Sequence, residues 1–188
     1  MEIKFTPWRM KYIKQSDGKA DGGCIFCAMA AASPQTDAEH LVLYRGERCF
    51  VVMNLYPYNP GHLMVVTNAH TADLAGLDAA TAEELFTLTR RSVGLLEAEY
   101  GPHGFNLGIN LGRTAGAGIA EHLHVHIVPR WNGDANFMPI VGGTRLIPED
   151  LSGTYQRLRP RFDELRALLC QDDGAPSRGS VCCSGAED

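Results

Sequence analysis

The sequence predicts an α+β fold that combines several short strands with one long helix and a C-terminal helix. Short runs rich in β-branched and aromatic residues recur between turn signals, as expected for strands. Two longer stretches, 81–100 and 153–170, carry apolar residues at helical spacing. The length of 188 residues and the 45% hydrophobic composition suit a single domain, which we expect over residues 1–170.

The first predicted strands form a hairpin. The runs LVLYR (41–45) and RCFVVMN (48–54) are both β-rich and are separated by a Gly-Glu pair. The segment LYPYNPGH (55–62) is rich in Pro and Gly and cannot continue a strand. It is therefore expected to form a loop, after which HLMVVT (62–67) resumes the sheet.

The long helix is predicted from its start and stop signals as well as its periodicity. Thr81 and Glu84 have the spacing of a capping box, and a Gly-Pro pair at 101–102 supplies the stop. Between them, apolar residues recur at helical spacing: Leu85, Phe86, Leu88, Val93, Leu96 and Tyr100. A second amphipathic helix is expected over 153–170, followed by a polar tail, 171–188, with the composition of a disordered segment.

Three of the seven histidines, His122, His124 and His126, alternate along the string EHLHVHIVPR in a strand predicted over 121–128. Successive side chains of a strand point to opposite faces, so the three imidazoles are expected on one face. The residues between them, which would enter the core, are Leu123, Val125 and Ile127. Imidazole can be a nucleophile, an acid or base, or a metal ligand near neutral pH. The row therefore indicates chemistry on a phosphate, an acyl group or a metal.

A glycine-rich loop, LGRTAGAGIA (111–120), separates the histidine strand from the strand predicted at GFNLGIN (104–110). It joins two strands, so it is not the strand-to-helix turn of a dinucleotide fingerprint, and it lacks the Lys and Ser/Thr of a P-loop. Its glycines nevertheless allow backbone N–H groups to approach an anion closely. Two interpretations follow: a plain connector, or a phosphate cradle beside the histidines.

Composition and charge exclude several classes of protein. The formal net charge of −5 argues against a general nucleic-acid binder, whose affinity would rest on basic phosphate contacts. No apolar run approaches the roughly 18 residues that indicate a membrane span, and the N-terminus lacks the apolar centre of a signal peptide. The six cysteines are scattered rather than arranged as a disulfide framework, which favours a reducing compartment. We therefore expect a cytoplasmic protein.

The motif HLHVHIV followed by Pro-Arg resembles the signature of the histidine triad family of nucleotide hydrolases and transferases. The upstream string NPGHLMVVTNAH is similar to the family's preceding strand. Within the family, WRM in the N-terminal arm (1–23) and RWNGDANFMPIVGGTRLIP resemble the branch of the fragile histidine triad hydrolases and bacterial diadenosine tetraphosphate phosphorylases. The resemblance implies an antiparallel sheet of about five strands with a long helix, paired as a two-fold homodimer.

The same resemblance implies a reaction and its catalytic residues. The reaction is attack on the α-phosphorus of a nucleotide derivative through a covalent nucleotidyl-histidine. By position in the motif, His124 is the nucleophile, and His126 would donate to a phosphoryl or bridging oxygen. The backbone N–H groups expected to hold the developing charge belong to Gly116, Ala117, Gly118 and Ile119. Gly118 departs from the family pattern, because relatives often carry Ser or Gln there, so only a backbone donor remains.

Substrate-binding positions follow from the resemblance as well. Asn54 occupies the position that binds the ribose hydroxyls, and Asn110 the position associated with phosphate contact. Phe26, Met29 and Leu55 fall where the family holds the base. Ordinary core packing is the alternative interpretation of these three apolar residues.

A metal site is a further expectation. A single CxxC motif, here CIFC at 24–27, is weak evidence because zinc needs four ligands. In some bacterial histidine triad proteins and related uridylyltransferases, a His after the GH strand and the first triad His complete the site. The matching ligands here would be Cys24, Cys27, His70 and His122. The resemblance thus implies a structural Zn²⁺, against the alternative of no metal, and no organic cofactor is expected.

Three functions of different kinds are compatible with these residues. The first is an enzyme that cleaves dinucleoside polyphosphates, such as diadenosine tetraphosphate or triphosphate, by hydrolysis or phosphorolysis. The second is a nucleoside phosphoramidate hydrolase, which the same nucleophile permits. The third is a non-catalytic module that binds zinc and nucleotides, in which the histidines serve only as ligands. The resemblance around WNGDANF favours the first, with adenine nucleotides as substrates.

Overall fold

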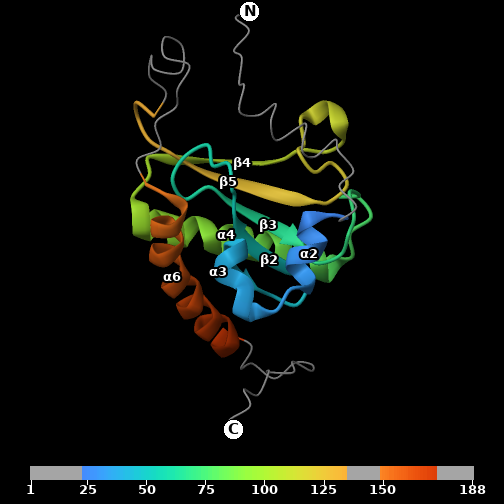
Figure 1. Cartoon of the computed structure of the whole chain (residues 1–188), viewed down its shortest axis with the longest axis horizontal. Coiled ribbons are helices and arrows are strands. Elements are labelled where there is room, and N and C mark those ends of the chain that lie inside the picture. Colours follow the sequence, from blue (N-terminus) through green and yellow to red (C-terminus); the bar gives the residue numbers. More distant parts are fainter. Residues whose placement is uncertain (1–22, 135–148, 173–188) are drawn as a thin grey trace, which may run out of the picture.

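The computed structural model describes residues 23–134 and 149–172 (Figure 1). The helices are α2 (Ile25–Ala31), α3 (Asp37–His40), α4 (Ala79–Tyr100) and α6 (Leu151–Asp172), with 3₁₀ turns η1 (Pro34–Thr36) and η2 (Arg113–Ala115). The strands are β1 (Val42–Arg45), β2 (Cys49–Met53), β3 (Leu63–Thr67), β4 (Gly104–Ile109) and β5 (His124–Arg130). The expected arm and tail fall outside the described residues, apart from Gly23 and residues 171 and 172, which end α6.

The five strands form one sheet in the order β1-β2-β3-β5-β4, and every neighbouring pair is antiparallel. This confirms the predicted α+β class and the antiparallel sheet. The central strands β2 and β3 are buried at every position because both faces of the sheet are covered there. The runs CFVVM and LMVVT are almost entirely apolar and show no alternation with polar residues. This is the pattern expected of strands that are buried on both faces.

Helices cover the two faces of the sheet separately. On one face, α4 and α6 pack over a core that contains Leu123, Val125 and Ile127, as the period-two pattern predicted. On the other face, α2 packs over a smaller cluster that contains Phe26 and Phe50. Figure 1 shows α4 crossing behind the strands while α2 and α3 lie in front of them. The histidine row lies on the α2 face, beside the smaller cluster.

The start of α4 differs from the capping box predicted at Thr81 and Glu84. The N-cap is Asp78, whose carboxylate accepts hydrogen bonds from the Thr81 backbone N–H (3.0 Å) and hydroxyl (2.6 Å). Glu84 instead accepts the backbone N–H groups of Arg48 (3.0 Å) and Cys49 (3.3 Å). The Asp78 carboxylate caps more directly, since it lies just before the helix. The capping-box spacing predicted Thr81 as the N-cap, three residues after the observed N-cap, Asp78.

The remaining correction in α4 concerns Phe86, which the helical spacing included among the apolar residues. It is 71% exposed, whereas its neighbour Leu85 is buried against the sheet. Adjacent residues of a helix lie about 100° apart, and the exposure of Phe86 places it on the solvent side of α4. The predicted stop is confirmed, because Gly101 ends the helix in the left-handed conformation with φ 52°.

The histidine strand is also shifted relative to the prediction over 121–128. In the structure β5 begins at His124, and His122 lies in the bend before it. In the antiparallel register with β3, Val66 is opposite His124 and Met64 is opposite His126. The second and third histidines of the row therefore lie on a strand that is paired on both sides, with β3 and with β4.

The two edges of the sheet differ. At the β1 edge, side chains of α6 cover the strand, and the Tyr155 hydroxyl and the Arg159 guanidinium both donate to the Val42 carbonyl. At the β4 edge the strand is largely exposed, and Leu107 is 52% exposed. Of the helices in the described parts of the chain, none combines the length and the apolar character that a membrane span requires.

Candidate functional site

Three imidazoles converge on the α2 face of the sheet. His122 and His124 are buried, at 1% and 5% exposure, and His126 is half-buried. The ring of Phe26 lies against both His122 and His124, with ring centroids 5.4 and 5.1 Å apart. The rings of His124 and His126 meet edge to face at 4.8 Å. The expected row is therefore one contiguous surface, with its first two members beneath α2.

His122 is oriented by a backbone carbonyl. Its Nε2 donates to the carbonyl oxygen of Thr67 at 2.7 Å, and Thr67 ends the neighbouring strand β3. A neutral imidazole that donates from Nε2 carries its lone pair on Nδ1. Burial lowers the pKa of His122, which favours this neutral form. The Nδ1 lone pair is thus available as a ligand.

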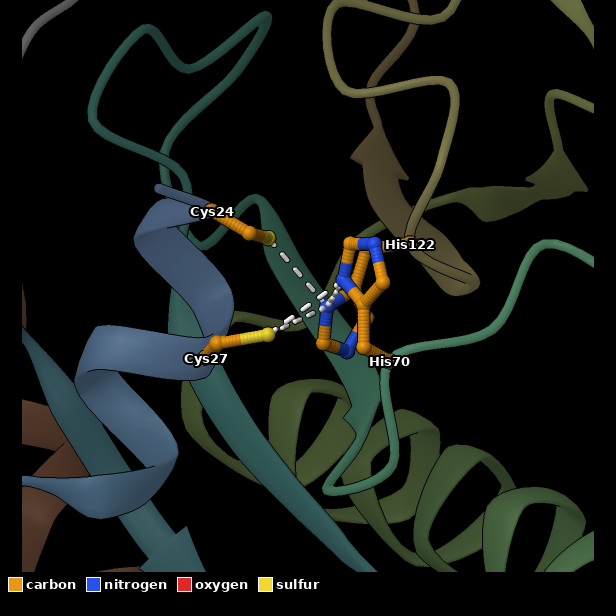
Figure 2. A group of neighbouring side chains, drawn as sticks. All are labelled: Cys24, Cys27, His70 and His122. Carbon is orange, nitrogen blue, oxygen red and sulfur yellow. Dashed lines mark hydrogen bonds between the residues drawn. The ribbon is translucent and has the colours of Figure 1, made fainter. Parts of the chain in front are cut away.

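Four candidate ligand atoms surround that lone pair: Cys24 Sγ, Cys27 Sγ, His70 Nδ1 and His122 Nδ1. All lie within 4.8 Å of one another. The His122 nitrogen is 3.3 Å from the Cys24 sulfur, 3.6 Å from the Cys27 sulfur and 3.3 Å from the His70 nitrogen. Figure 2 shows both sulfurs projecting from the first turn of α2 toward the two rings, which come from the segments after β3 and before β5. The structure therefore brings together all four residues predicted as metal ligands.

The spacing of these atoms suits a tetrahedral metal ion. Zinc bonds of about 2.0–2.1 Å to nitrogen and 2.3 Å to sulfur would separate two nitrogens by about 3.3 Å, and nitrogen from sulfur by about 3.6 Å. The Nδ1–Nδ1 separation of 3.3 Å is close to the first value, and the Nδ1–Sγ separations of Cys24–His122, Cys27–His122 and Cys27–His70, at 3.3–3.6 Å, are close to the second. Burial and the neighbouring Cys24 thiol raise the pKa of the Cys27 thiol, so a cation is what would stabilise both sulfurs as thiolates. The donor set thus fits a divalent metal of the zinc type.

α2 is also held in place by ionic contacts that do not involve the cluster. The Arg45 guanidinium pairs with the buried Asp37 carboxylate at 2.8 Å and donates to the Ala30 carbonyl at the end of α2. Arg159 of α6 reaches the same carboxylate at 3.5 Å. The cysteines are therefore carried on a helix that is anchored at both ends, by Phe26 and the cluster at one end and by Arg45 at the other.

His124 has the opposite tautomer to His122. Its Nδ1 donates to the carbonyl oxygen of His122 at 2.7 Å, and a carbonyl oxygen can only accept. The lone pair of the neutral ring is therefore on Nε2. Burial lowers the pKa of His124, so the neutral ring is favoured over imidazolium. A buried neutral imidazole with a free lone pair is suited to act as a nucleophile.

His126 is paired with a histidine that sequence reasoning missed. His62 was given no role, yet it is 2% exposed and its Nε2 lies 3.0 Å from Nδ1 of His126. The Tyr58 backbone N–H donates to His62 Nδ1 at 3.1 Å, which leaves the His62 proton on Nε2. His62 therefore donates to His126, and neutral His126 carries its own proton on Nε2. The sequence alone carries no signal for this contact, because it depends on the pairing of β3 with β5, which sets Met64 opposite His126.

The other predicted site residues occupy different environments. The amide nitrogen of Asn54 lies 3.4 Å from both ring nitrogens of His62, and its carbonyl oxygen accepts the Tyr56 backbone N–H. Leu55 is 58% exposed beside it, whereas Phe26 is 2% exposed. The half-buried residues are Met29, Asn110, Ala117, Gly118 and Ile119. Gly116, at the start of the loop segment 116–119, has φ 81°, a conformation that suits glycine.

Comparison with known proteins places this geometry in a family. The HIT (histidine triad) domain model matches residues 35–133. The chain is 44% identical over 160 residues to the AP-4-A phosphorylase of Mycobacterium tuberculosis, covering 82% of this chain and 80% of that protein. It is 33% identical over 93 residues to a Schizosaccharomyces pombe asymmetrical bis(5'-nucleosyl)-tetraphosphatase, covering 50% of each.

Solved structures agree with the sequence comparison. The zinc-bound histidine triad family protein from Mycobacterium smegmatis matches with a TM-score of 0.61 and 25% identity, over 78% of this chain and 97% of that one. The hypothetical histidine triad nucleotide-binding protein ST2152 from Sulfolobus tokodaii matches with a TM-score of 0.59 and 26% identity, over 76% of this chain and 94% of that one. The chain belongs to the histidine triad family.

Proposed function

We propose that the protein cleaves dinucleoside polyphosphates at the α-phosphate, with diadenosine tetraphosphate as the substrate and inorganic phosphate as the acceptor. The observation that carries the proposal is the fixed tautomer of His124, whose Nε2 lone pair lies beside the half-buried ring of His126. The choice of phosphorolysis over hydrolysis is supported by the 44% identity to a relative named AP-4-A phosphorylase.

The proposed reaction has two displacements at phosphorus. The Nε2 lone pair of His124 attacks the α-phosphorus of diadenosine tetraphosphate, forming a P–N bond as the P–O bond to the departing ATP breaks. A phosphate oxygen then attacks the same phosphorus, and the P–N bond breaks to release ADP and the neutral ring. The Nε2–H of His126 donates to a phosphoryl or bridging oxygen and so stabilises the charge that develops there.

Further residues are assigned to the substrate in this proposal. Asn54 would bind the ribose hydroxyls, and its contact with His62 would couple ribose binding to the histidine row. Asn110 and the backbone N–H groups of the segment 116–119 would contact the phosphates. Leu55 is exposed enough to contact a base directly, whereas buried Phe26 packs from α2 against the His122 and His124 rings.

We further propose that Cys24, Cys27, His70 and His122 hold a structural Zn²⁺. Four protein ligands would close the coordination sphere, which is the pattern of a structural zinc rather than a catalytic one. The ion would join α2 to the segments on either side of the paired strands β3 and β5. Its chemistry would be to neutralise two thiolates and to fix the ring of His122. Because both thiols must stay reduced, the proposal includes a reducing compartment such as the cytoplasm.

Quaternary structure is the last part of the proposal: two chains associate through β4 to form a homodimer. β4 is an edge strand whose exposed residues include Leu107, and an exposed edge is a ready surface for strand pairing. Pairing of β4 with its copy would bury both edges at once around a two-fold axis.

The products of diadenosine tetraphosphate test the proposed reaction. Incubation with inorganic phosphate is expected to release ATP and ADP in equal amounts, with turnover that rises with phosphate concentration. Chromatographic separation of the nucleotides gives both quantities. Release of ATP and AMP at a rate independent of phosphate would instead identify water as the acceptor, and the absence of any cleavage would contradict the proposed function.

Replacement of His124 tests the nucleophile. We expect His124→Ala to lower kcat by about 10³-fold or more, because losses of covalent nucleophiles have effects of this size. Binding of diadenosine tetraphosphate, measured by calorimetry, is expected to persist. His40→Ala, at the end of α3, is the matched control and should keep full activity. A His124→Ala enzyme that retained more than about a tenth of the activity would rule out the covalent mechanism.

Metal analysis tests the zinc site. Protein purified without chelators is expected to carry about one zinc per chain, and Cys27→Ser is expected to lose it. Cys49→Ala is the control, because Cys49 is fully buried on the opposite face of the sheet and does not belong to the cluster. Wild-type protein without zinc, or equal zinc in Cys27→Ser and wild type, would count against the site.

Light scattering tests the dimer. The wild-type protein is expected to have about twice the 20.5 kDa mass of one chain, as a closed two-fold pair requires. Leu107→Asp should shift it to the monomer, whereas Leu74→Asp, a change at another exposed leucine outside β4, should not. A wild-type mass of one chain, or a dimer that survives Leu107→Asp unchanged, would contradict pairing through β4.

A further inference from the structure

A compact polar network lies at the end of β5, away from the histidine row. The Asp134 carboxylate accepts two hydrogen bonds from the Arg130 guanidinium, at 2.6 and 2.9 Å, and one from the Trp131 backbone N–H at 3.2 Å. Its side chain is 11% exposed. The hydrogen bonds from Arg130 hold the pKa of the Asp134 carboxyl well below its usual range. Asp134 is therefore a fixed anion with defined geometry.

The same carboxylate reaches a second segment of the chain through Asn59. The amide nitrogen of Asn59 donates to Asp134 at 2.9 Å and to the Pro129 carbonyl of β5 at 2.7 Å. Asn59 is 5% exposed, so both of these hydrogen bonds are shielded from water. Two donor hydrogens of one amide are thus used to tie the loop between β2 and β3 to the end of β5.

This tied loop is the one that sets the tautomer of His62. Tyr58, which precedes Asn59, donates its backbone N–H to His62 Nδ1, and the Asn59 carbonyl accepts the His62 backbone N–H at 3.2 Å. The ring of Tyr58 also stacks on His62, with centroids 4.9 Å apart. A displacement of Asn59 would therefore move the donor that faces His62 Nδ1.

The contact between the Tyr58 N–H and His62 also decides which nitrogen of His126 carries the proton. In the alternative arrangement, His126 would donate from Nδ1 to His62 Nε2, and each ring would carry its proton on Nδ1. The Nδ1–H of His62 would then face the Tyr58 N–H, two donors 3.1 Å apart with no acceptor between them. The Tyr58 N–H thus disfavours the arrangement with the His126 proton on Nδ1. The arrangement that it favours leaves this proton on Nε2, where His126 can donate it.

We propose that Asp134, together with Arg130, is a positioning residue that acts through Asn59, Tyr58 and His62 to keep the His126 proton on Nε2, facing the substrate. This inference rests on the proposed function, because the Nε2–H of His126 is the donor assigned to the phosphoryl or bridging oxygen. Asp134 itself contacts no substrate. It holds the loop so that a backbone N–H is aimed at the correct ring nitrogen.

The test combines nitrogen NMR of ¹⁵N-histidine-labelled protein with steady-state kinetics. In the wild-type protein, the His126 and His62 shifts should report a proton on Nε2 and a lone pair on Nδ1. In Asp134→Ala, a Nδ1–H population is expected at His126, and kcat should fall by about 10–100-fold, as for other residues that orient a functional histidine. The KM for diadenosine tetraphosphate should change far less, since the substrate contacts are intact.

Companion variants separate positioning from general destabilisation. Asp134→Asn keeps one acceptor oxygen for Asn59 and should lie between wild type and Asp134→Ala in both readouts. Asn59→Ala leaves the Arg130–Asp134 pair intact but removes the hydrogen bond from Asn59 to Asp134, so it should reproduce the effect of Asp134→Ala. If Asp134→Ala does not fold, the His126 tautomer in Asn59→Ala tests the positioning role. Glu99→Ala also removes a carboxylate shared by arginines, Arg157 and Arg161 on α6, and should leave the His126 tautomer unchanged.

The possible outcomes are distinct. If His126 stays entirely in the Nε2–H form in both Asp134→Ala and Asn59→Ala, the positioning role is overturned, whatever happens to activity. The NMR readout needs no substrate. A tautomer shift in these variants, combined with a wild-type enzyme that does not cleave diadenosine tetraphosphate, would therefore support the positioning role while contradicting the proposed function.

Discussion

A neutral imidazole has one nitrogen that donates and one that accepts, so the partner of the first decides what the second can do. His122, His124 and His62 obey this constraint through a backbone group. The Thr67 carbonyl leaves a lone pair on Nδ1 of His122, and the His122 carbonyl leaves one on Nε2 of His124. The Tyr58 N–H acts through His62 on His126, whose Nε2 carries a proton, unlike the Nε2 of His124, which carries a lone pair.

The sheet supplies these backbone partners at fixed positions. β3 ends at Thr67 beside His122 and pairs along its length with β5, and the loop that enters β3 carries Tyr58. The hydrogen bonds of His122 and His124 lie among buried residues, where water does not compete for them and where a donor without an acceptor is costly. A slip of one residue between β3 and β5 would turn the histidines to the opposite face, separating His122 from Thr67 and His126 from His62.

Sequence reasoning found those features that repeat along the chain. The period of two correctly placed His124 and His126 on one face and Leu123, Val125 and Ile127 in the core. The four candidate metal ligands came from a resemblance, and the structure gathers them in one cluster. What could not be found depends on contacts between distant segments. His62 is a lone histidine in the sequence, and its role appears only when β3 and β5 pair. Asp134 and Asn59 are 75 positions apart, and no motif in either segment predicts their hydrogen bond.

His122 connects the two parts of the site. Its ring presents Nδ1 to the two cysteines and His70, while its backbone carbonyl orients the ring of His124. Side chain and carbonyl belong to one residue in the bend before β5, so a shift of His122 would alter both the cluster and the carbonyl that orients His124. Phe26, which packs on both rings from α2, provides a second connection between the same elements. The cluster of cysteines and histidines thus shares one residue, His122, with the contacts that orient the His124 ring, although no atom of His124 belongs to the cluster.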